Sequence, residues 1–357
     1  VQVVKLGSSN WQYRKASAKN KINEIAEDLI KIAAERSLKK GTKFSVQEPY
    51  YSKFINEFEF QDTEDQVNVT SELLFDLNSG FPMDRLICGD VGFGKTEVAL
   101  RGAFNVAMSG SQVAFIVPTT LLCRQHYQNF TKRFHNFPLK IEQISRLNSI
   151  AENNEIIERI NSGECDIVVG THALLNNKIK FKKLGMLIID EEQHFGVSQK
   201  EKIKSLRSNV HVLALTATPI PRTLQMSLVG LRDLSIISTA PLNRQNINTE
   251  VIDFNNKKIT TAIEAEISRD GQLYYVCPRI NELKEVEDFL KHYLPNIKYQ
   301  VAHGQMSPKK LKNTMIDFYN NEFQLLLCTT IVESGLDLQK TNTMIIHNAD
   351  KFGLSQL

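Results

Sequence analysis

From Phe81 onward the chain alternates short, continuous apolar runs with longer amphipathic stretches. The apolar runs are rich in Val, Ile and Leu and have the length of strands, and the stretches between them are long enough for helices. Strands that are apolar throughout are buried on both faces, which is typical of parallel sheets covered by helices. The pattern therefore predicts an α/β fold built on parallel sheets.

The predicted strands fall into two groups. The first group is residues 85–88, 112–117, 140–144, 166–169, 186–189 and 210–215. The second group is residues 249–254, 272–277, 298–302, 324–328 and 343–347, with helices such as 282–293 and 308–319 between them. Residues 239–248 are polar, contain Pro and lack an apolar period, which indicates a linker. Since 357 residues exceed the usual size of one hydrophobic core, we predict two α/β domains in tandem, 49–240 and 241–357.

Residues 1–48 have a different character and are predicted to form a basic helical linker. Apolar residues between Ala18 and Ala33 recur at helical spacing, and charged residues fill the opposite face. The first 50 residues carry a net charge of +5, whereas the whole chain carries only +3. This small excess argues against a protein that binds nucleic acid through bulk charge alone.

The five cysteines are scattered without a CxxC pair, and most lie inside apolar runs. This pattern predicts buried, reduced thiols and a cytoplasmic protein rather than a metal or disulfide site. No apolar stretch approaches the roughly 18 residues of a membrane span, and no signal peptide is visible. Because the chain opens on Val, we expect it to be a piece of a longer protein.

A glycine-rich segment, GDVGFGKT at residues 89–96, lies between a predicted strand and a predicted helix. It matches the pattern GxxxxGK[ST] of a phosphate-binding loop, whose backbone N–H groups point at phosphate oxygens. In such a loop Lys95 neutralises the β- and γ-phosphates and Thr96 holds Mg²⁺. The segment predicts binding of ATP with Mg²⁺.

Two carboxylates, Asp190 and Glu191, follow the predicted strand 186–189. Ligands of open α/β sheets bind at the carboxyl ends of the strands. We assign Asp190 as the Mg²⁺ holder and Glu191 as the group that polarises the attacking water, with Lys95 as the third catalytic residue.

A predicted helix begins just after Thr63, which is a sound N-cap. Capping is compatible with a second role for this segment. Gln66, three residues later, could bind the edge of adenine, because its amide offers both a donor and an acceptor.

Seven ordered segments make the chain resemble a known family: GDVGFGKTEVALRGAF, PTTLLCRQHYQNF, GTHALL, DEEQHFGV, LTATPIPRTL, HGQM and CTTIVESGLDL. Together they are similar to the motor of bacterial transcription-repair coupling factors, superfamily-two ATPases related to the branch-migration helicase RecG. The segment KLGSSNW followed by a long helix resembles the stretch that precedes the motor in coupling factors, which favours them over RecG. The resemblance implies two RecA-like domains, the second of them cut short.

The resemblance also implies roles for individual residues. Phe60 and Gln66 would bracket adenine, and Asp337 would approach the ribose. The phosphate cradle would comprise Gly89, Gly92, Phe93, Gly94, Lys95 and Thr96. Thr216, Ala217 and Thr218 would couple nucleotide state to DNA. The DNA-tracking loops would comprise Thr119, Thr120, Gly170, Thr171 and His172 in the first domain, and His303, Gly304, Gln305, Thr329, Thr330, Glu333, Ser334 and Gly335 in the second.

For the complete protein the resemblance implies an ATP-driven translocase on double-stranded DNA in the bacterial cytoplasm. It would displace stalled RNA polymerase and recruit the excision-repair protein UvrA through domains outside this chain. Three other readings stay open: a RecG-like helicase, an ATP- and DNA-binding module without turnover, and a small-molecule kinase that uses the same phosphate loop.

Two departures from the family pattern are visible. His194 stands where the family has Arg, which would weaken an ion pair or a phosphate contact. The chain also stops at Leu357, before the family's QLRGRVGR segment with its arginine finger. We therefore expect impaired ATP hydrolysis by this chain alone.

Overall fold

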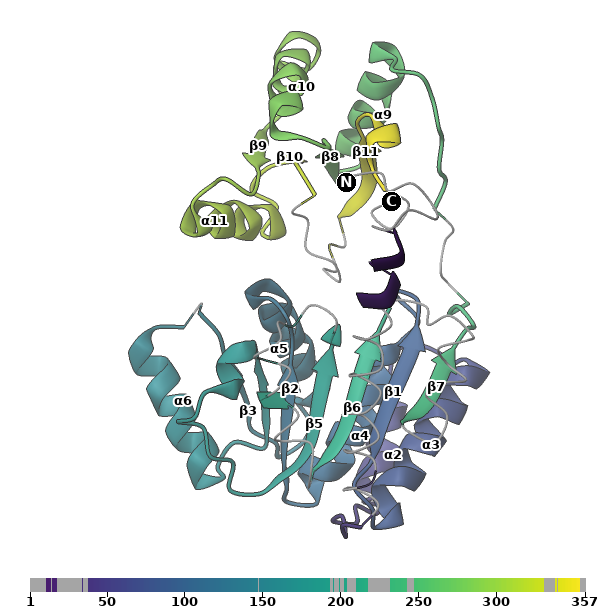
Figure 1. Ribbon diagram of the computed structural model, residues 1–357, viewed down its shortest axis with the longest axis vertical. Helices are drawn as coiled ribbons and strands as arrows, with labels where there is room; N and C mark the ends of the chain where they lie inside the picture. The colour runs from purple at the N-terminus through teal and green to yellow at the C-terminus, as the bar shows by residue number, and fades with distance from the viewer. Residues whose placement is uncertain are drawn as a thin grey trace. The chain divides into compact units, whose positions relative to one another are not determined.

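The computed structural model describes residues 38–146, 148–192, 210–217, 232–242, 247–330 and 340–353. It also describes 11–13, 15–17, 34, 195, 199, 202–203 and 338. The chain forms two compact units, residues 1–245 and 246–357 (Figure 1). Residues 11–13 and 15–17 are helical, and the rest of the predicted N-terminal helix, 18–33, lies outside the described residues. The predicted domain boundaries, between residues 48 and 49 and between residues 240 and 241, stay predictions.

The first unit is built on a seven-stranded parallel sheet with the order β3-β4-β2-β5-β6-β1-β7. Its strands are β1 (Asp84–Gly89), β2 (Gln112–Ile116), β3 (Ile141–Ile144), β4 (Ile167–Gly170), β5 (Leu184–Asp190), β6 (His211–Thr216) and β7 (Asp233–Ile237). Central strands β2, β4 and β6 are buried at every residue, as the continuous apolar runs predicted.

Helices cover this sheet and connect its strands. They are α2 (Tyr50–Asn56), α3 (Glu64–Ser79), α4 (Lys95–Met108), α5 (Thr120–Phe134) and α6 (Ile150–Ser162), with a short 3₁₀ turn η1 (His172–Leu175). Figure 1 shows α3 beside the edge strand β7 and α6 beside the opposite edge strand β3. All strands are parallel, so their carboxyl ends meet at one edge, where the predicted site residues lie.

The second unit has a four-stranded parallel sheet with the order β11-β8-β10-β9. Its strands are β8 (Gln272–Val276), β9 (Tyr299–Ala302), β10 (Leu325–Cys328) and β11 (Thr341–Ile346). Its helices are α9 (Asn256–Ser268), α10 (Ile280–Tyr293) and α11 (Pro308–Tyr319), and a 3₁₀ turn η3 spans Ala349–Lys351. Two parallel-sheet α/β units in tandem confirm the predicted fold class.

In each unit a buried glutamine side chain bonds the first residue of a central strand to the end of a helix. The amide of Gln112, the first residue of β2, donates to the carbonyls of Ile160 and Cys165, both at 2.9 Å. The amide of Gln272, the first residue of β8, makes the same pair of bonds, to carbonyls in α11 and in the turn after it, at 2.9 and 2.8 Å. Each glutamine is buried and ties the end of a helix to the start of a central strand.

Two strand assignments differ from the sequence prediction. Residues 249–254 were predicted to be a strand, and this was wrong: they join neither sheet, and Val251 is 94% exposed. The ring of Phe254 packs instead against Phe289 of α10 and against His347. Strand β7 was missed, because its sequence DLSII has only a short apolar run and its outer edge is partly exposed.

The five cysteines are buried and reduced, as their apolar sequence surroundings predicted. All five cysteines are free and buried, and burial raises the pKa of Cys123, Cys165, Cys277 and Cys328 to about 12. Such thiols stay protonated and unreactive near neutral pH.

Within the described part of the chain, no helix is long and apolar enough to cross a membrane.

Candidate functional site

The glycine-rich segment forms a tight turn between β1 and α4. Gly92 and Gly94 have φ angles of 79° and 80°, in the left-handed region where a side chain is strained. Gly94 is the N-cap of α4, so the first N–H groups of that helix face the turn. The ammonium of Lys95 folds back onto the loop and donates to the carbonyls of Gly89 and Asp90, at 2.6 and 2.9 Å. This strand–turn–helix is what the motif predicted.

Gln66 joins the start of α3 to the phosphate loop. Its Oε1 accepts from the backbone N–H of Thr63, which completes a capping box, and its Nε2 donates to the carbonyl of Phe93, both at 2.9 Å. A Cβ on Gly94 would lie 2.3 Å from that Nε2, so a side chain at this position would displace the Gln66 amide. The predicted N-cap at Thr63 is confirmed, and the adenine contact of Gln66 stays a prediction.

Phe60, the other residue expected at adenine, is 63% exposed. Its ring meets the ring of Phe58 edge-on, with centroids 5.6 Å apart. An exposed aromatic face three residues before the Thr63 cap fits stacking against a base, which also remains a prediction.

Asp190 ends β5 and Glu191 follows it, at the same sheet edge as the phosphate loop. Burial lowers the pKa of Lys95, while the negative charges of Asp190, Glu191 and Asp90 raise it, so that the pKa is lowered overall. The two predicted carboxylates are therefore close enough to act on the ammonium. The three residues assigned to catalysis, Lys95, Asp190 and Glu191, therefore lie close together.

Glu191 contacts the segment expected to relay nucleotide state. Its φ of 49° is left-handed, and its side chain is largely buried. Its Oε1 accepts from the backbone N–H of Ala217 at 3.1 Å, just after the buried Thr216 that ends β6. The third residue of that segment, Thr218, lies outside the described residues. The contact connects a predicted catalytic carboxylate with the predicted coupling segment.

The expected DNA-tracking residues of the first unit follow the carboxyl ends of β2 and β4. Thr119 caps α5 by accepting from the N–H of Leu122, and Thr120 is the first residue of that helix. Gly170 ends β4, and Thr171 caps the 3₁₀ turn that contains His172. They therefore share one edge of the sheet.

Arg146 was not predicted as part of this set. It follows β3, and its guanidinium lies 3.3 Å from Nε2 of His172. Burial, followed by the positive charge of Arg146, lowers the pKa of His172, which favours the neutral ring. A cation at this edge adds a group suited to a phosphate.

The expected residues of the second unit occupy the equivalent edge of its own sheet. His303, Gly304 and Gln305 follow β9, and Thr329 and Thr330 follow β10. The backbone N–H of Thr329 donates to the carbonyl of Ala302 at 3.2 Å, which brings the two loops together. Glu333, Ser334, Gly335, Asp337 and His194 lie outside the described residues, so their predicted roles stay predictions.

Two further side chains near the site escaped the sequence analysis. His126 of α5 lies 3.2 Å from Asp190, measured from Nε2 to Oδ2. Arg101 of α4 is 2% exposed and pairs with Asp62, in the loop that carries Phe60, at 2.9 Å. Both pairs join residues far apart in sequence, so no local pattern marks them.

The residues present fit ATP and Mg²⁺. The turn at Gly92 and Gly94 directs helix N–H groups outward, and the ammonium of Lys95 rests on carbonyls that a phosphate oxygen can replace. The hydroxyl of Thr96 and the carboxylate of Asp190 are oxygen ligands, the kind that Mg²⁺ prefers. This donor set agrees with the cofactors expected from the sequence.

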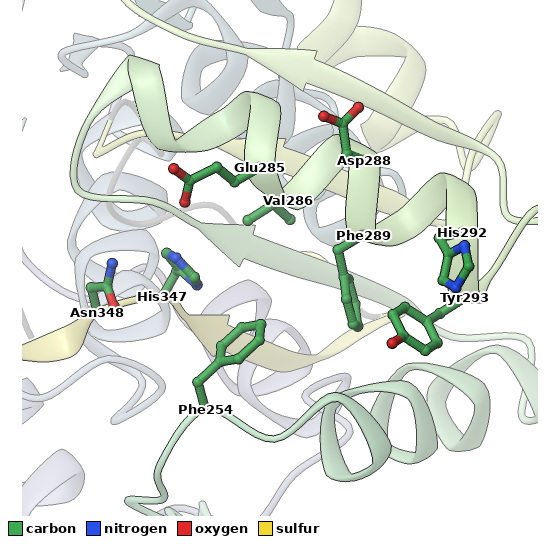
Figure 2. A pocket seen from close by; sticks show the side chains of 9 residues that line it. All are labelled: Phe254, Glu285, Val286, Asp288, Phe289, His292, Tyr293, His347 and Asn348. Atoms are coloured by element: carbon green, nitrogen blue, oxygen red, sulfur yellow. The ribbon is translucent and has the colours of Figure 1, made fainter.

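A separate pocket lies in the second unit and contains none of these residues. Phe254, Phe289, Tyr293 and His347 are among its lining residues, and its volume is about 500 Å³. In Figure 2 the rings of Phe254, Phe289 and Tyr293 lie near one another, while the carboxylate of Asp288 points away from Phe254. The pocket is an aromatic surface feature distinct from the predicted nucleotide site.

Known proteins share this arrangement. The DEAD/DEAH box helicase family matches residues 63–227, and the helicase conserved C-terminal domain matches residues 255–357. The solved structure of RecG bound to a three-way DNA junction has a TM-score of 0.78 and 29% sequence identity. That similarity covers 96% of this chain and 47% of RecG. The fold and site therefore define a two-domain helicase motor of superfamily two.

More specific relatives are transcription-repair-coupling factors. The one from Rickettsia bellii (strain RML369-C) is 51% identical over 360 residues, which cover 100% of this chain and 32% of that protein. The one from Myxococcus xanthus is 46% identical over 357 residues, covering 100% and 30%. The chain is similar over its full length to these transcription-repair-coupling factors and spans about a third of their length.

Proposed function

We propose that this chain is the ATP-driven motor of a translocase that moves on double-stranded DNA, displaces stalled RNA polymerase and couples transcription to nucleotide excision repair. The observation that carries the proposal is the gathering of Lys95, Asp190 and Glu191 at one sheet edge, with Glu191 bonded to Ala217. The names of the relatives supply the link between transcription and repair. The bacterial cytoplasm is our proposed location. RNA polymerase and UvrA would be engaged by parts outside this chain.

Each site residue has a defined task in this proposal. Lys95 pairs with the β- and γ-phosphates of ATP, and Thr96 and Asp190 hold Mg²⁺, which neutralises phosphate charge when bound. Glu191 orients the attacking water and accepts its proton. Hydrolysis changes what Glu191 faces, and its bond to the Ala217 N–H passes that change to the end of β6.

DNA would be held by loops rather than by a basic surface. Threonine hydroxyls and backbone N–H groups after β2, β4, β9 and β10 are suited to phosphate oxygens and carry no base preference. Such contacts agree with a chain whose net charge is only +3. Binding is therefore expected to be independent of sequence.

The test uses the full-length protein and a transcription complex stalled on DNA. The unaltered protein should hydrolyse ATP faster with double-stranded DNA and release the polymerase, scored by native gel. Lys95→Ala should lose both activities. Glu191→Gln should still bind fluorescent ATP but lose turnover by at least about 100-fold, because its amide cannot accept the proton. A Lys95→Ala protein that still releases polymerase would refute the assignment.

A RecG-like function is the second candidate, because the RecG structure aligns with 96% of this chain. Branch migration of a three-way DNA junction, measured beside polymerase release, separates the two. Junction unwinding without polymerase release would favour the RecG-like reading. ATPase activity of residues 1–357 alone tests the expected need for an arginine finger supplied from outside this chain.

A further inference from the structure

His126 and Asp190 form a buried pair that the assigned tasks leave unused. The imidazole Nε2 lies 3.2 Å from Oδ2 of Asp190, and the two residues are 64 positions apart in sequence. The His126 side chain is 6% exposed and that of Asp190 is 14% exposed. A polar contact this well shielded from water is strong and directional.

The chemistry of the two groups fixes which atom donates. An ionised carboxylate only accepts hydrogen bonds, so the N–H of the pair must be on Nε2 of His126. The other ring nitrogen, Nδ1, is buried and has no hydrogen-bond partner among the described residues. Asp190 is therefore the polar contact that orients this ring.

Aromatic packing holds the imidazole in place. Its centroid lies 4.9 Å from the ring of Phe115 on β2 and 5.7 Å from the ring of Phe130 on α5. Phe115 and Phe130 are fully buried. A ring fixed in this way presents its N–H at one position, and this N–H engages Oδ2 of the carboxylate that would hold Mg²⁺.

The same helix begins at the expected DNA-tracking loop. Thr119 caps α5, and His126 lies less than two turns further along it. A shift of α5 when a strand binds at Thr119 and Thr120 would therefore move the imidazole relative to Asp190. This route is separate from the bond between Glu191 and Ala217.

We propose that His126 is a positioning residue that holds the Mg²⁺-binding carboxylate of Asp190 and links it to strand binding at the start of α5. The inference rests on the proposed function of the site. Removal of a hydrogen-bond partner that orients a metal ligand typically weakens metal binding by about 10- to 100-fold.

The test compares three variants of the full-length protein. His126→Leu removes the donor and keeps an apolar side chain of useful size, His126→Gln restores an N–H at similar reach, and Phe130→Leu alters packing in the same aromatic group without touching the bond. Mn²⁺ affinity is measured by electron paramagnetic resonance in the presence of ADP, and thermal melting is recorded for each protein.

His126→Leu should bind Mn²⁺ at least about 10-fold more weakly, while His126→Gln and Phe130→Leu should stay within about threefold of the unaltered protein. ADP affinity in EDTA should be similar in all four proteins, because Asp190 acts through the metal. Unchanged Mn²⁺ affinity in His126→Leu would overturn the proposal. Equal losses in all three variants, in step with their melting temperatures, would also overturn it.

Adding double-stranded DNA tests the link to strand binding. DNA should change the Mn²⁺ affinity of the unaltered protein, and this change should shrink by at least about half in His126→Leu and persist in Phe130→Leu. If DNA changes the Mn²⁺ affinity by the same factor in every protein, the proposed link between His126 and strand binding is wrong. An unaltered protein that binds neither ADP nor DNA would instead defeat the proposed function, which keeps the two failures apart.

Discussion

Asp65 shows how one side chain can anchor a distant segment. Its Oδ2 accepts from the N–H of Ser238 at 2.8 Å, from the hydroxyl of Ser238 at 2.9 Å and from the N–H of Thr239 at 2.8 Å. These two residues directly follow β7, where the chain leaves the sheet towards the second unit. Asp65 therefore sets the point at which the linker departs, beside the Gln66 cap.

This anchor predicts a pH-dependent contribution to stability. The hydrogen bonds, first that from the Ser238 N–H, hold the pKa of Asp65 below its ordinary value of 3.8. The contribution is therefore fully present above the unfolded pKa and is lost as pH falls through the lower folded pKa. Asp65→Asn should cost about 1 kcal/mol at pH 6, because one charged acceptor is lost at a partly exposed site.

Urea denaturation between pH 6 and pH 3 measures this difference. The penalty of Asp65→Asn should shrink towards the acid end, whereas Glu64→Gln, at the exposed neighbouring position, should show a small penalty throughout. A penalty for Asp65→Asn that is the same at every pH would contradict the assigned cause.

At the scale of elements, a buried ionic network joins α4 and α5 to the loop before α3. Arg101 pairs with Asp62 at 2.9 Å and with Glu97 at 3.3 Å, and Glu97 also accepts from Arg133 at 2.8 Å. The guanidinium of Arg133 stacks 3.7 Å above the ring of Phe54. The network fixes the loop that carries Phe60 relative to the phosphate-loop helix.

Removing the centre of this network should be costly. Arg101→Met leaves Asp62 without its partner and Glu97 with one cation fewer, which should lower the free energy of unfolding by about 3 kcal/mol. The matched control is Lys132→Ala, which breaks an exposed pair with Glu59 and should cost no more than about 0.5 kcal/mol. Guanidinium denaturation measures the free energy of unfolding of both variants. Equal losses in Arg101→Met and Lys132→Ala would contradict a network role for Arg101.

The elements that the sequence predicted well are those with a local signal. The continuous apolar runs identified the buried strands, and the glycine pattern identified the turn between β1 and α4. Strand β7 was missed and residues 249–254 were wrongly assigned, because edge segments with mixed polarity owe their state to neighbouring strands rather than to their own pattern.

The site was predicted to a similar degree. Lys95, Asp190 and Glu191 carry motifs, so their proximity could be anticipated. His126, Arg101 and Arg146 act through partners 26 to 64 positions away, and only the fold brings those partners near. His126 and Arg101 lie in amphipathic helices and Arg146 lies in a turn, and the sequence around each residue does not distinguish a buried contact from an exposed one.

At the scale of the whole molecule, the two units have separate sheets and separate apolar cores. The phosphate loop belongs to the first unit alone. Ligand binding stabilises only the part of a protein that binds it, by about 2.7 kcal/mol at 100 times Kd. ATP with Mg²⁺ should therefore raise the melting temperature of the first unit's calorimetric transition by more than that of the second unit, which contributes only the predicted ribose contact of Asp337.

The Lys95→Ala variant shows which calorimetric transition belongs to the first unit. It should keep both unfolding peaks but lose the ATP-dependent rise in melting temperature. Two peaks that move together with ATP would show that the units unfold as one cooperative body, contrary to this expectation. Scanning calorimetry at several ATP concentrations provides the measurement.

The position of β1 in its sheet has a consequence for synthesis on the ribosome. Its neighbours are β6 and β7, which begin at His211 and Asp233. At about 5–20 residues per second, β1 is made on the order of ten seconds before either neighbour exists. A nascent chain must therefore keep this apolar strand from aggregating, and the phosphate loop can take shape only when nearly all of the first unit has emerged.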